Sequence, residues 1–311
     1  MPESEERPYH LPVMLAECLE GLTLRPGGIY VDVTFGGGGH SRAIVEQLGE
    51  GGRLFGFDQD SDAEANASSI PSDRFTFVKA NFRYLKRFLR LYGVHQVDGI
   101  LADLGISSHQ IDEPERGFST RYEADLDMRM DRDQGQTAAN ILNTYPEADL
   151  HRILGMYGEI KNARTVAAAI VSARTNQPLQ TSSELRTLLE RYAPKGKPAK
   201  YLAQVYQALR IEVNEEMAAL EGFLGQASEV LKPGGRLVVM SYHSLEDRMV
   251  KNFIAKGKIH GELEKDFYGN PIRPLEAVTR KPITATPEEI ERNNRARSAK
   301  LRVATKLEAG S

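Results

Sequence analysis

The sequence predicts an α/β protein in which a parallel sheet, covered by helices on both faces, is interrupted by an all-helical insertion. Strand and helix patterns alternate with short connections over roughly the first hundred residues, an order that favours parallel strands. A polar and largely helical stretch follows, and strand patterns return near residue 236. We therefore expect a sheet domain built from 1–113 and 214–311, and a helical domain over 114–213.

Apolar spacing and turn residues predict the individual elements. Leu15, Cys18, Leu19 and Leu22 share one face of a short helix. The strands expected next are 29–33, 53–57, 75–78 and 97–102, with helices at 40–48 and 82–91. After a Pro-Gly-Gly turn, further strands are expected at 236–241, 277–280 and 298–304.

Composition excludes several classes of protein. The 311 residues are 41% hydrophobic and 27% charged, as in folded globular domains, and no apolar run approaches the roughly 20 residues that cross a bilayer. The first ten residues are acidic and polar, unlike a secretory signal. Cys18 is the single cysteine, so no internal disulfide forms and no usual zinc spacing is filled. We expect a cytoplasmic protein without a membrane segment or a metal.

Charge is informative only locally, because the formal net charge of -3 is mild. Six Lys or Arg lie between Arg186 and Arg210 against the single acid Glu190, and the segment 292–302 is also basic. These are candidate phosphate-facing surfaces. Solvated helix faces are the alternative explanation.

A glycine run between the first strand and the first helix predicts a nucleotide cofactor. Gly36–Gly39 allow tight turning and close approach of backbone to a ligand beyond the carboxyl ends of the strands. Asp58 ends the second strand about 20 residues later, where a carboxylate accepts hydrogen bonds from ribose hydroxyls. Phe82, after the third strand, is a candidate for packing on adenine, with plain core packing as the alternative.

The third glycine of the dinucleotide fingerprint separates two cofactors. That position holds Ser41 or Arg42, so a nicotinamide dinucleotide is disfavoured. The sulfonium and ammonium groups of S-adenosylmethionine require carboxylates instead, and Asp32 and Asp103 at strand ends suit them.

Asp103 is also the candidate catalytic residue. The exocyclic amine of a nucleobase is a poor nucleophile that must be oriented and hydrogen-bonded. DNA amino methyltransferases carry Pro-Pro and an aromatic after the corresponding polar residue, whereas Leu104-Gly105 follows here. We favour a cofactor-side role for Asp103 with contact to the base. A reaction that depends on orientation alone, with no general base, remains an alternative.

Polar residues at the end of the later strand are candidate substrate contacts. A target base could stack on Tyr242, and His243 is a candidate general base. The alternative for Ser244 is a helix N-cap, completed by Asp247 three residues on.

At this point the chain resembles one family, the small-subunit rRNA cytosine-N4 methyltransferases, known as RsmH or MraW. The resemblance covers nearly the whole chain and rests on motifs in a fixed order. These are 10–14 (HLPVM), 34–41 (TFGGGGHS), 103–108 (DLGISS), 116–119 (RGFS), 126–131 (LDMRMD), 207–214 (QALRIEVN), 241–248 (SYHSLEDR) and 297–302 (RSAKLR).

The resemblance implies a Rossmann-like methyltransferase domain interrupted by a helical domain. It implies S-adenosylmethionine as cofactor and, as substrate, N4 of cytosine 1402 in 16S rRNA, in the small ribosomal subunit. The cofactor contacts it implies are Gly38, Gly39, His40, Asp58, Phe82, Asp103 and Gln110.

One segment departs from the family pattern. A His-Pro-Ala-Thr-Arg run is usual before Gln207, and 197–204 (KPAKYLAQ) stands here. Lys197 and Lys200 keep positive charge there, so with Arg210 they are candidate RNA contacts, although lysine binds phosphate as a point charge where arginine forks.

Two other functions remain as alternatives. A non-catalytic nucleotide- and RNA-binding ribosome assembly factor would keep the pocket without turnover. A nicotinamide-dependent oxidoreductase ranks last because of the missing glycine. A homodimer is compatible with the size of the chain and its helical insertion.

Overall fold

The computed structural model describes residues 12–70 and 73–308. The first two residues of the first family motif, His10 and Leu11, lie outside the described residues. Within the described ranges, no helix is both long enough and apolar enough to cross a membrane.

The chain divides into two compact units, which we call the α/β unit and the helical unit. The α/β unit runs through Gly105 and again from Ala219, and the helical unit is Ile106–Ala218. The predicted insertion, 114–213, lies inside the helical unit. The unit starts before residue 114 because Ile106 already packs on the helical core.

A seven-stranded sheet forms the centre of the α/β unit, in the order β3-β2-β1-β4-β5-β7-β6. Its strands are β1 (Ile29–Asp32), β2 (Arg53–Asp58), β3 (Phe75–Lys79), β4 (Val97–Asp103), β5 (Leu231–Ser241), β6 (Leu275–Ala277) and β7 (Lys300–Lys306). Strands β1 to β5 pair in parallel, which confirms the predicted parallel sheet. The chain reverses its direction of progress across the sheet between β1 and β4. Open α/β sheets bind ligands beyond the carboxyl ends of the strands at such a point.

The last two strands pair differently from the others. Strand β7 is antiparallel to β5 and to β6, and it lies between them. The strand expected at 277–280 is wrong in position, since β6 begins at Leu275. Leu275 is fully buried on the core, whereas Val278 is 48% exposed, so burial decides where pairing starts.

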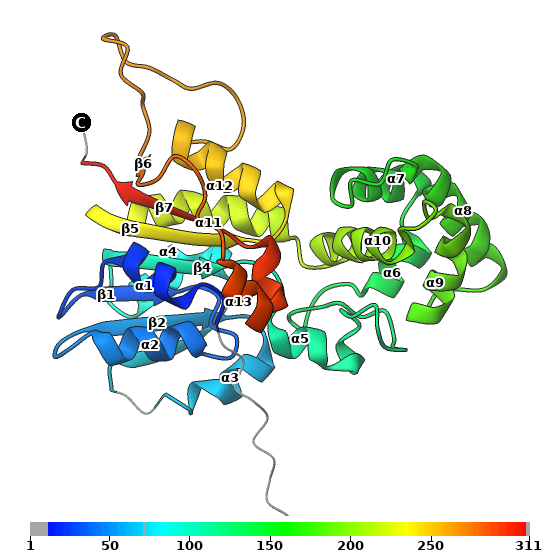
Figure 1. Cartoon of the computed structure of the whole chain (residues 1–311), viewed down its shortest axis with the longest axis horizontal. Coiled ribbons are helices and arrows are strands. Elements are labelled where there is room, and N and C mark those ends of the chain that lie inside the picture. Colours follow the sequence, from blue (N-terminus) through cyan, green and yellow to red (C-terminus); the bar gives the residue numbers. More distant parts are fainter. Residues whose placement is uncertain (1–11, 71–72, 309–311) are drawn as a thin grey trace, which may run out of the picture. The chain divides into compact units, whose positions relative to one another are not determined.

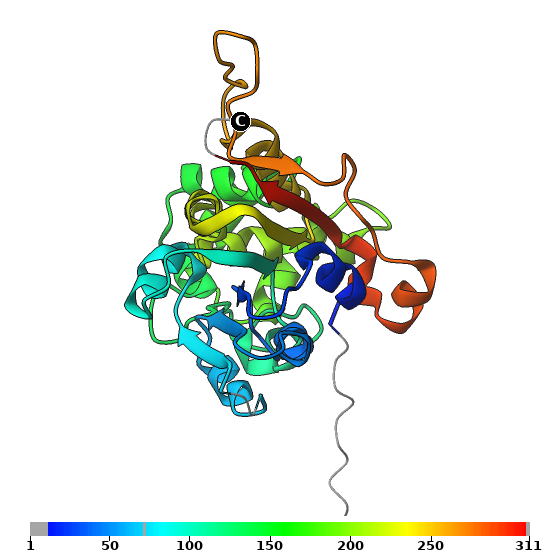
Figure 2. The same cartoon turned by 90° about the vertical axis from the view of Figure 1, so that its left-hand side faces the viewer.

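Helices cover both faces of the sheet (Figures 1 and 2). Neighbouring residues of β4 point to opposite faces: Ile100 joins one core and Leu101 the other. On the Ile100 side lie η1 (Phe82–Tyr84), α4 (Leu85–Leu91), α11 (Glu216–Val230) and α12 (Ser244–Lys256). On the Leu101 side lie α1 (Leu15–Leu22), α2 (Gly39–Gln47), α3 (Ser61–Ala67), α13 (Pro287–Arg292) and η4 (Asn294–Ser298).

The helical unit has a separate hydrophobic core. Its elements are α5 (Ser108–Asp112), η2 (Pro114–Arg116), α6 (Ala138–Thr144), α7 (Glu147–Met156), α8 (Ala163–Asn176), α9 (Ser182–Leu189), η3 (Glu190–Tyr192) and α10 (Pro198–Val213).

Three family motifs meet in the helical unit as structural contacts. The Arg116 guanidinium donates to the carbonyls of Arg129 and Met130, both at 3.1 Å. The Asn214 side chain accepts from Met130 N at 2.7 Å and donates to Met128 O at 2.8 Å. Each contact satisfies backbone groups of an irregular segment that has no regular ladder to pair them. These motif residues therefore hold the unit together.

Candidate cofactor and acceptor site

The glycine loop leaves β1 and enters α2 with its backbone open to a ligand. Gly36 N donates to the Asp58 carboxylate at 2.8 Å, which ties the loop to the end of β2. Gly38 has φ +76°, and a Cβ there would lie 2.9 Å from the Phe35 ring. A Cβ on Gly37 would meet nothing within 4 Å. The loop is thus tight on its inner side and free on its outer side, as close approach of a cofactor requires.

Asp58 lies at the carboxyl end of β2, where the sequence predicts a ribose contact. Its Oδ1 accepts from Asp60 N at 2.9 Å, while Oδ2 accepts from Gly36 N. Burial raises the pKa of Asp58 to about 6, and the two backbone hydrogen bonds oppose that rise. Remaining lone pairs of the carboxylate are available to hydroxyl donors.

Asp32, at the end of β1, has a supporting position beneath the loop. It is 1% exposed, and it accepts from Thr34 N at 3.1 Å and from Ser41 Oγ at 2.7 Å. The sequence predicts that Asp32 faces the cofactor, and no local pattern reports its contacts with Thr34 and Ser41. The hydrogen bonds instead make Asp32 the residue that fixes the loop against α2.

Asp103 is held from two sides at the carboxyl end of β4. Its backbone N donates to Thr34 Oγ1 at 2.6 Å, and Tyr242 donates its hydroxyl to Asp103 Oδ1 at 2.7 Å. Burial raises the pKa of Asp103 to about 6, while the charge of His40 and the Tyr242 hydrogen bond lower it. The side chain keeps 25% of its surface exposed, so a substrate can reach it.

His40 lies beside Asp103 in the first turn of α2. Its Nε2 is 3.0 Å from Val13 O, and a carbonyl only accepts, so Nε2 carries a proton. The ring is thereby oriented with Nδ1 4.0 Å from Asp103 Oδ2. His40 and Asp103, which are predicted from separate motifs, are therefore neighbours. They lie where the order of strands reverses between β1 and β4, which we call the switch point of the sheet.

Phe82 packs in the α/β unit beside the end of β3. Its ring makes an edge contact with Phe223, with centroids 5.4 Å apart, and it is only partly buried. Core packing on one side and a partly exposed side are both present, so the two predicted roles are compatible.

His243, the candidate general base, is the N-cap of α12. Its side chain accepts from Glu246 N, and Glu246 returns a bond to the backbone, which completes a capping box. His243 Nε2 lies 3.1 Å from Glu246 Oε1. The prediction that Ser244 caps the helix with Asp247 is wrong, because the box closes one residue earlier. Asp247 instead pairs with Arg302 at 2.7 Å.

The remaining predicted contacts lie in the helical unit. Gln110 is buried in α5, where its side chain accepts from Ser107 N at 3.1 Å. Lys197 and Lys200 are exposed at the start of α10. Arg210 forms two hydrogen bonds with Glu216, at 2.8 and 3.0 Å, so most of its charge is already balanced.

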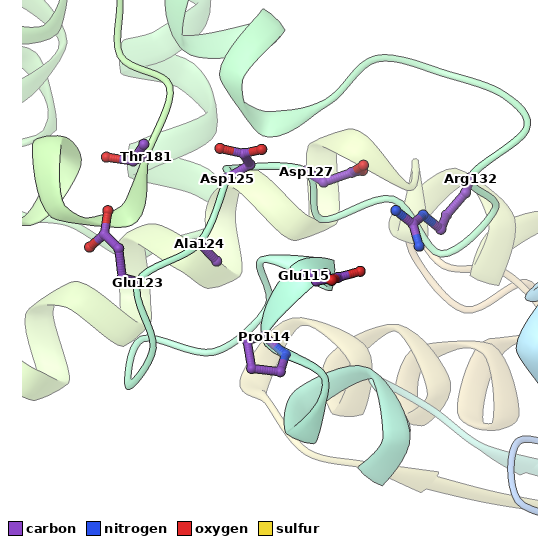
Figure 3. A pocket seen from close by; sticks show the side chains of 8 residues that line it. All are labelled: Pro114, Glu115, Glu123, Ala124, Asp125, Asp127, Arg132 and Thr181. Atoms are coloured by element: carbon purple, nitrogen blue, oxygen red, sulfur yellow. The ribbon is translucent and has the colours of Figure 1, made fainter.

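The helical unit also contains an open pocket of about 520 Å³ (Figure 3). Its charged lining is mostly acidic: Glu115, Glu123, Asp125, Asp127 and Arg132. Such a lining repels phosphate, so the pocket is not the surface expected to meet an RNA backbone.

Five parallel strands, a glycine loop and three carboxylates at the strand ends define the class, a Rossmann-like enzyme that binds a nucleoside cofactor carrying positive charge. The family model described as MraW methylase family matches residues 7–307. The chain belongs to the MraW methylase family, and its cofactor is S-adenosylmethionine.

Relatives resemble the chain over nearly their full length. The proteins named ribosomal RNA small subunit methyltransferase H from Cytophaga hutchinsonii and Flavobacterium johnsoniae are 61% and 56% identical to it. The matches cover 95% and 96% of this chain and 99% and 98% of those proteins. The protein of the same name from Bacteroides thetaiotaomicron is 55% identical over 98% of this chain and 99% of its own length.

Proposed function

We propose that this protein transfers a methyl group from S-adenosylmethionine to N4 of cytosine 1402 in 16S rRNA, on small ribosomal subunits in the cytoplasm. The observation that carries the proposal is Asp103: it ends β4 at the switch point of a methylase sheet, held by Thr34 and Tyr242. The relatives, which match over nearly their full length, are named ribosomal RNA small subunit methyltransferase H, and this supports a small-subunit rRNA substrate.

The residues of the α/β unit fit the cofactor. Its sulfonium and ammonium groups are cationic, and Asp32, Asp58 and Asp103 concentrate negative charge along one edge of the sheet. The open outer side of Gly37 leaves room for the ligand. When bound, S-adenosylmethionine supplies an electrophilic methyl group. We assign its binding to Gly38, Gly39, His40, Asp58, Phe82 and Asp103. The family resemblance implies Gln110 of the helical unit as a further contact.

Asp103 has the catalytic role in this proposal. Its carboxylate accepts a hydrogen bond from the cytosine N4 amine, which turns the nitrogen lone pair toward the methyl donor. The same oxygen then receives the proton that the methylated nitrogen loses. Tyr242 holds the carboxylate in one orientation through the 2.7 Å hydrogen bond, and Thr34 fixes the backbone beneath it.

His243 and Ser244 act as positioning residues for the substrate edge. The Nδ1 of His243 accepts from Glu246 N, so taking up a proton from a substrate at this nitrogen would break the cap of α12. Ser244 is exposed at the first turn of the same helix, where backbone N–H groups favour a phosphate or a base oxygen.

The helical unit supplies phosphate contacts. Lys197 and Lys200 are exposed together with Lys195, and cations in such a cluster bind RNA mainly through its backbone. Arg210 supports the end of α10 through Glu216 and contributes less to binding.

Transfer of labelled methyl from S-adenosylmethionine to small subunits that lack native methylation tests the proposal. Nucleoside analysis should yield N4-methylcytidine from the parent protein, and Asp103→Asn should reduce the rate by about 100-fold or more. Asp98→Asn is the matched control, since Asp98 lies on the same strand at the opposite edge and pairs with Lys232. Label on a ribose or a ring carbon would overturn the proposal. Cofactor and subunit binding without any transfer would favour the assembly factor.

A further inference from the structure

Helix α12 presents positive charge on its exposed face. Arg248 and Lys251 are exposed one turn apart, and within residues 12–70 and 73–308 neither has an ion-pair partner. The two acidic residues of the helix do not neutralise these cations, since Glu246 is buried and Asp247 pairs with Arg302. The exposed face of α12, the helix that follows β5, therefore carries cations that no acidic residue balances.

The segment from Gly257 to Pro274, which joins α12 to β6, exposes two aromatic rings. We call it the aromatic loop; it projects from the α/β unit beyond α12 and β6 (Figures 1 and 2). Phe267 is 97% exposed and Tyr268 is 85% exposed. Their centroids are 5.5 Å apart with the planes at 87°. Two adjacent aromatic side chains that are almost fully exposed to solvent are unusual and indicate an interaction site.

An ordered turn holds these rings outward. The Asp266 carboxylate accepts from Tyr268 N and Asn270 N, both at 2.8 Å, and from the Asn270 amide at 3.0 Å. Asp266 N donates to Asn270 O at 2.9 Å, and Ile272 N donates to Glu264 O at 2.8 Å. The exposed rings are therefore a feature of a folded hairpin and lose little conformational freedom when they bind.

We propose that the aromatic loop and the exposed face of α12 form a second RNA-docking surface, on which unpaired bases stack on Phe267 and Tyr268 while phosphates meet Arg248 and Lys251. This inference rests on the proposed rRNA substrate. Stacking on aromatic rings is the usual way proteins hold unpaired RNA bases.

The charge and length of this surface favour RNA over a protein partner. The loop itself carries no net charge, because Lys258, Lys265 and Arg273 are balanced by Glu262, Glu264 and Asp266. The positive charge of this surface therefore comes from Arg248 and Lys251 of α12. The 13 residues of α12 rise about 20 Å. Bases on the loop would therefore lie several nucleotides away from the base being methylated, and the surface adds affinity without touching the chemistry.

Fluorescence of Phe267→Trp tests the stacking directly, because the chain has no tryptophan of its own. Protein-free 16S rRNA, added at low salt so that binding is assured, should quench this single indole through base stacking. Leu91→Trp is the matched control, an exposed position on α4 that should not be quenched. No quenching at position 267 when rRNA is bound, or equal quenching at both positions, would overturn the proposal.

Replacement of both rings separates RNA from a protein partner. Phe267→Ala with Tyr268→Ala should weaken binding to unmethylated small subunits by about tenfold or more and raise KM, with kcat unchanged. The double variant Phe267→Leu with Tyr268→Leu should bind small subunits as weakly as the alanine variant, because leucine keeps apolar area but has no ring face. Restored binding with leucine would indicate a protein partner and overturn the proposal.

The same samples keep the two proposals distinguishable. If the parent protein methylates another atom or none, the proposed function fails. Quenching at position 267 and the loss of affinity are measured without methyl transfer, so they still decide whether the loop binds RNA.

Discussion

The two units of the molecule handle charge in opposite ways. In the α/β unit the candidate carboxylates lie at strand ends, partly or fully buried, and each accepts at least one hydrogen bond. In the helical unit the candidate RNA contacts are exposed lysines at the start of α10. Buried, oriented groups act on cofactor binding and rate, whereas exposed cations act on substrate affinity and respond to salt. The predictions below test this division.

The largest effect on cofactor binding is expected at Asp58. Asp58→Asn removes the charge and one acceptor from the proposed ribose site, so S-adenosylmethionine should bind about 10- to 100-fold more weakly by calorimetry. Asp60→Asn is the control, since Asp60 caps α3 by accepting from Asp62 N. Equal losses in the two variants would mean that both act through the fold of the loop.

The lysine cluster tests the other side of the comparison. Changing Lys195, Lys197 and Lys200 together to Gln should raise KM for small subunits by about tenfold at physiological salt and leave kcat unchanged. The slope of log affinity against log salt should fall by up to about three. Lys161→Gln, an exposed cation of the same unit, should change neither quantity much. A fall in kcat would break the division of roles.

A substitution at Tyr242 tests the role of Asp103 as the residue that receives the proton. Tyr242→Phe removes the hydrogen bond that lowers the pKa of Asp103, so that pKa should rise above its value of about 6. The rate should fall about tenfold, and the acid limb of the kcat profile should move to higher pH. Tyr201→Phe, which loses a comparable bond to Asn162 in the helical unit, should leave the profile in place. A uniform loss at every pH would count against the assignment.

The last effect is expected in stability and is measured apart from activity. The folded pKa of Asp103 is raised to about 6, above an unfolded value near 3.9. Its contribution is therefore fully present below about pH 4 and is lost as pH rises through 6. Because the two pKa values differ by about two units, Asp103 alone should lower the free energy of unfolding without cofactor by about 3 kcal/mol across this window. Urea titrations of Asp103→Asn should show a shallower fall, and an unchanged slope would contradict the burial of this carboxyl.

Strands β1 to β4 could be predicted to within a few residues, because buried parallel strands combine apolar runs with punctuating glycine and aspartate. Helix α3 was not predicted, since Ala63 is its one buried residue and the segment lacks apolar periodicity. Its signal was the N-cap Asp60 with Asp62 and Glu64 in the first turn.

The site divides in the same way. Asp58 and Asp103 could be placed because carboxyl ends of parallel strands share an edge. The hydrogen bond from Tyr242 to Asp103 joins residues 139 positions apart, and no local pattern reports such a contact. The N-cap of α12 was not predicted, because serine is a commoner N-cap than histidine. His243 caps this helix because it forms a capping box with Glu246.

The placement of β7 between β5 and β6 has a consequence for the order in which the chain folds. The helical unit is one continuous segment, so all of its core is available once Ala218 has been synthesised. The sheet cannot be completed until β7 has been synthesised, because β6 pairs only with β7. On a translating ribosome, the strand that completes the sheet is therefore made only after the helical unit has been able to fold.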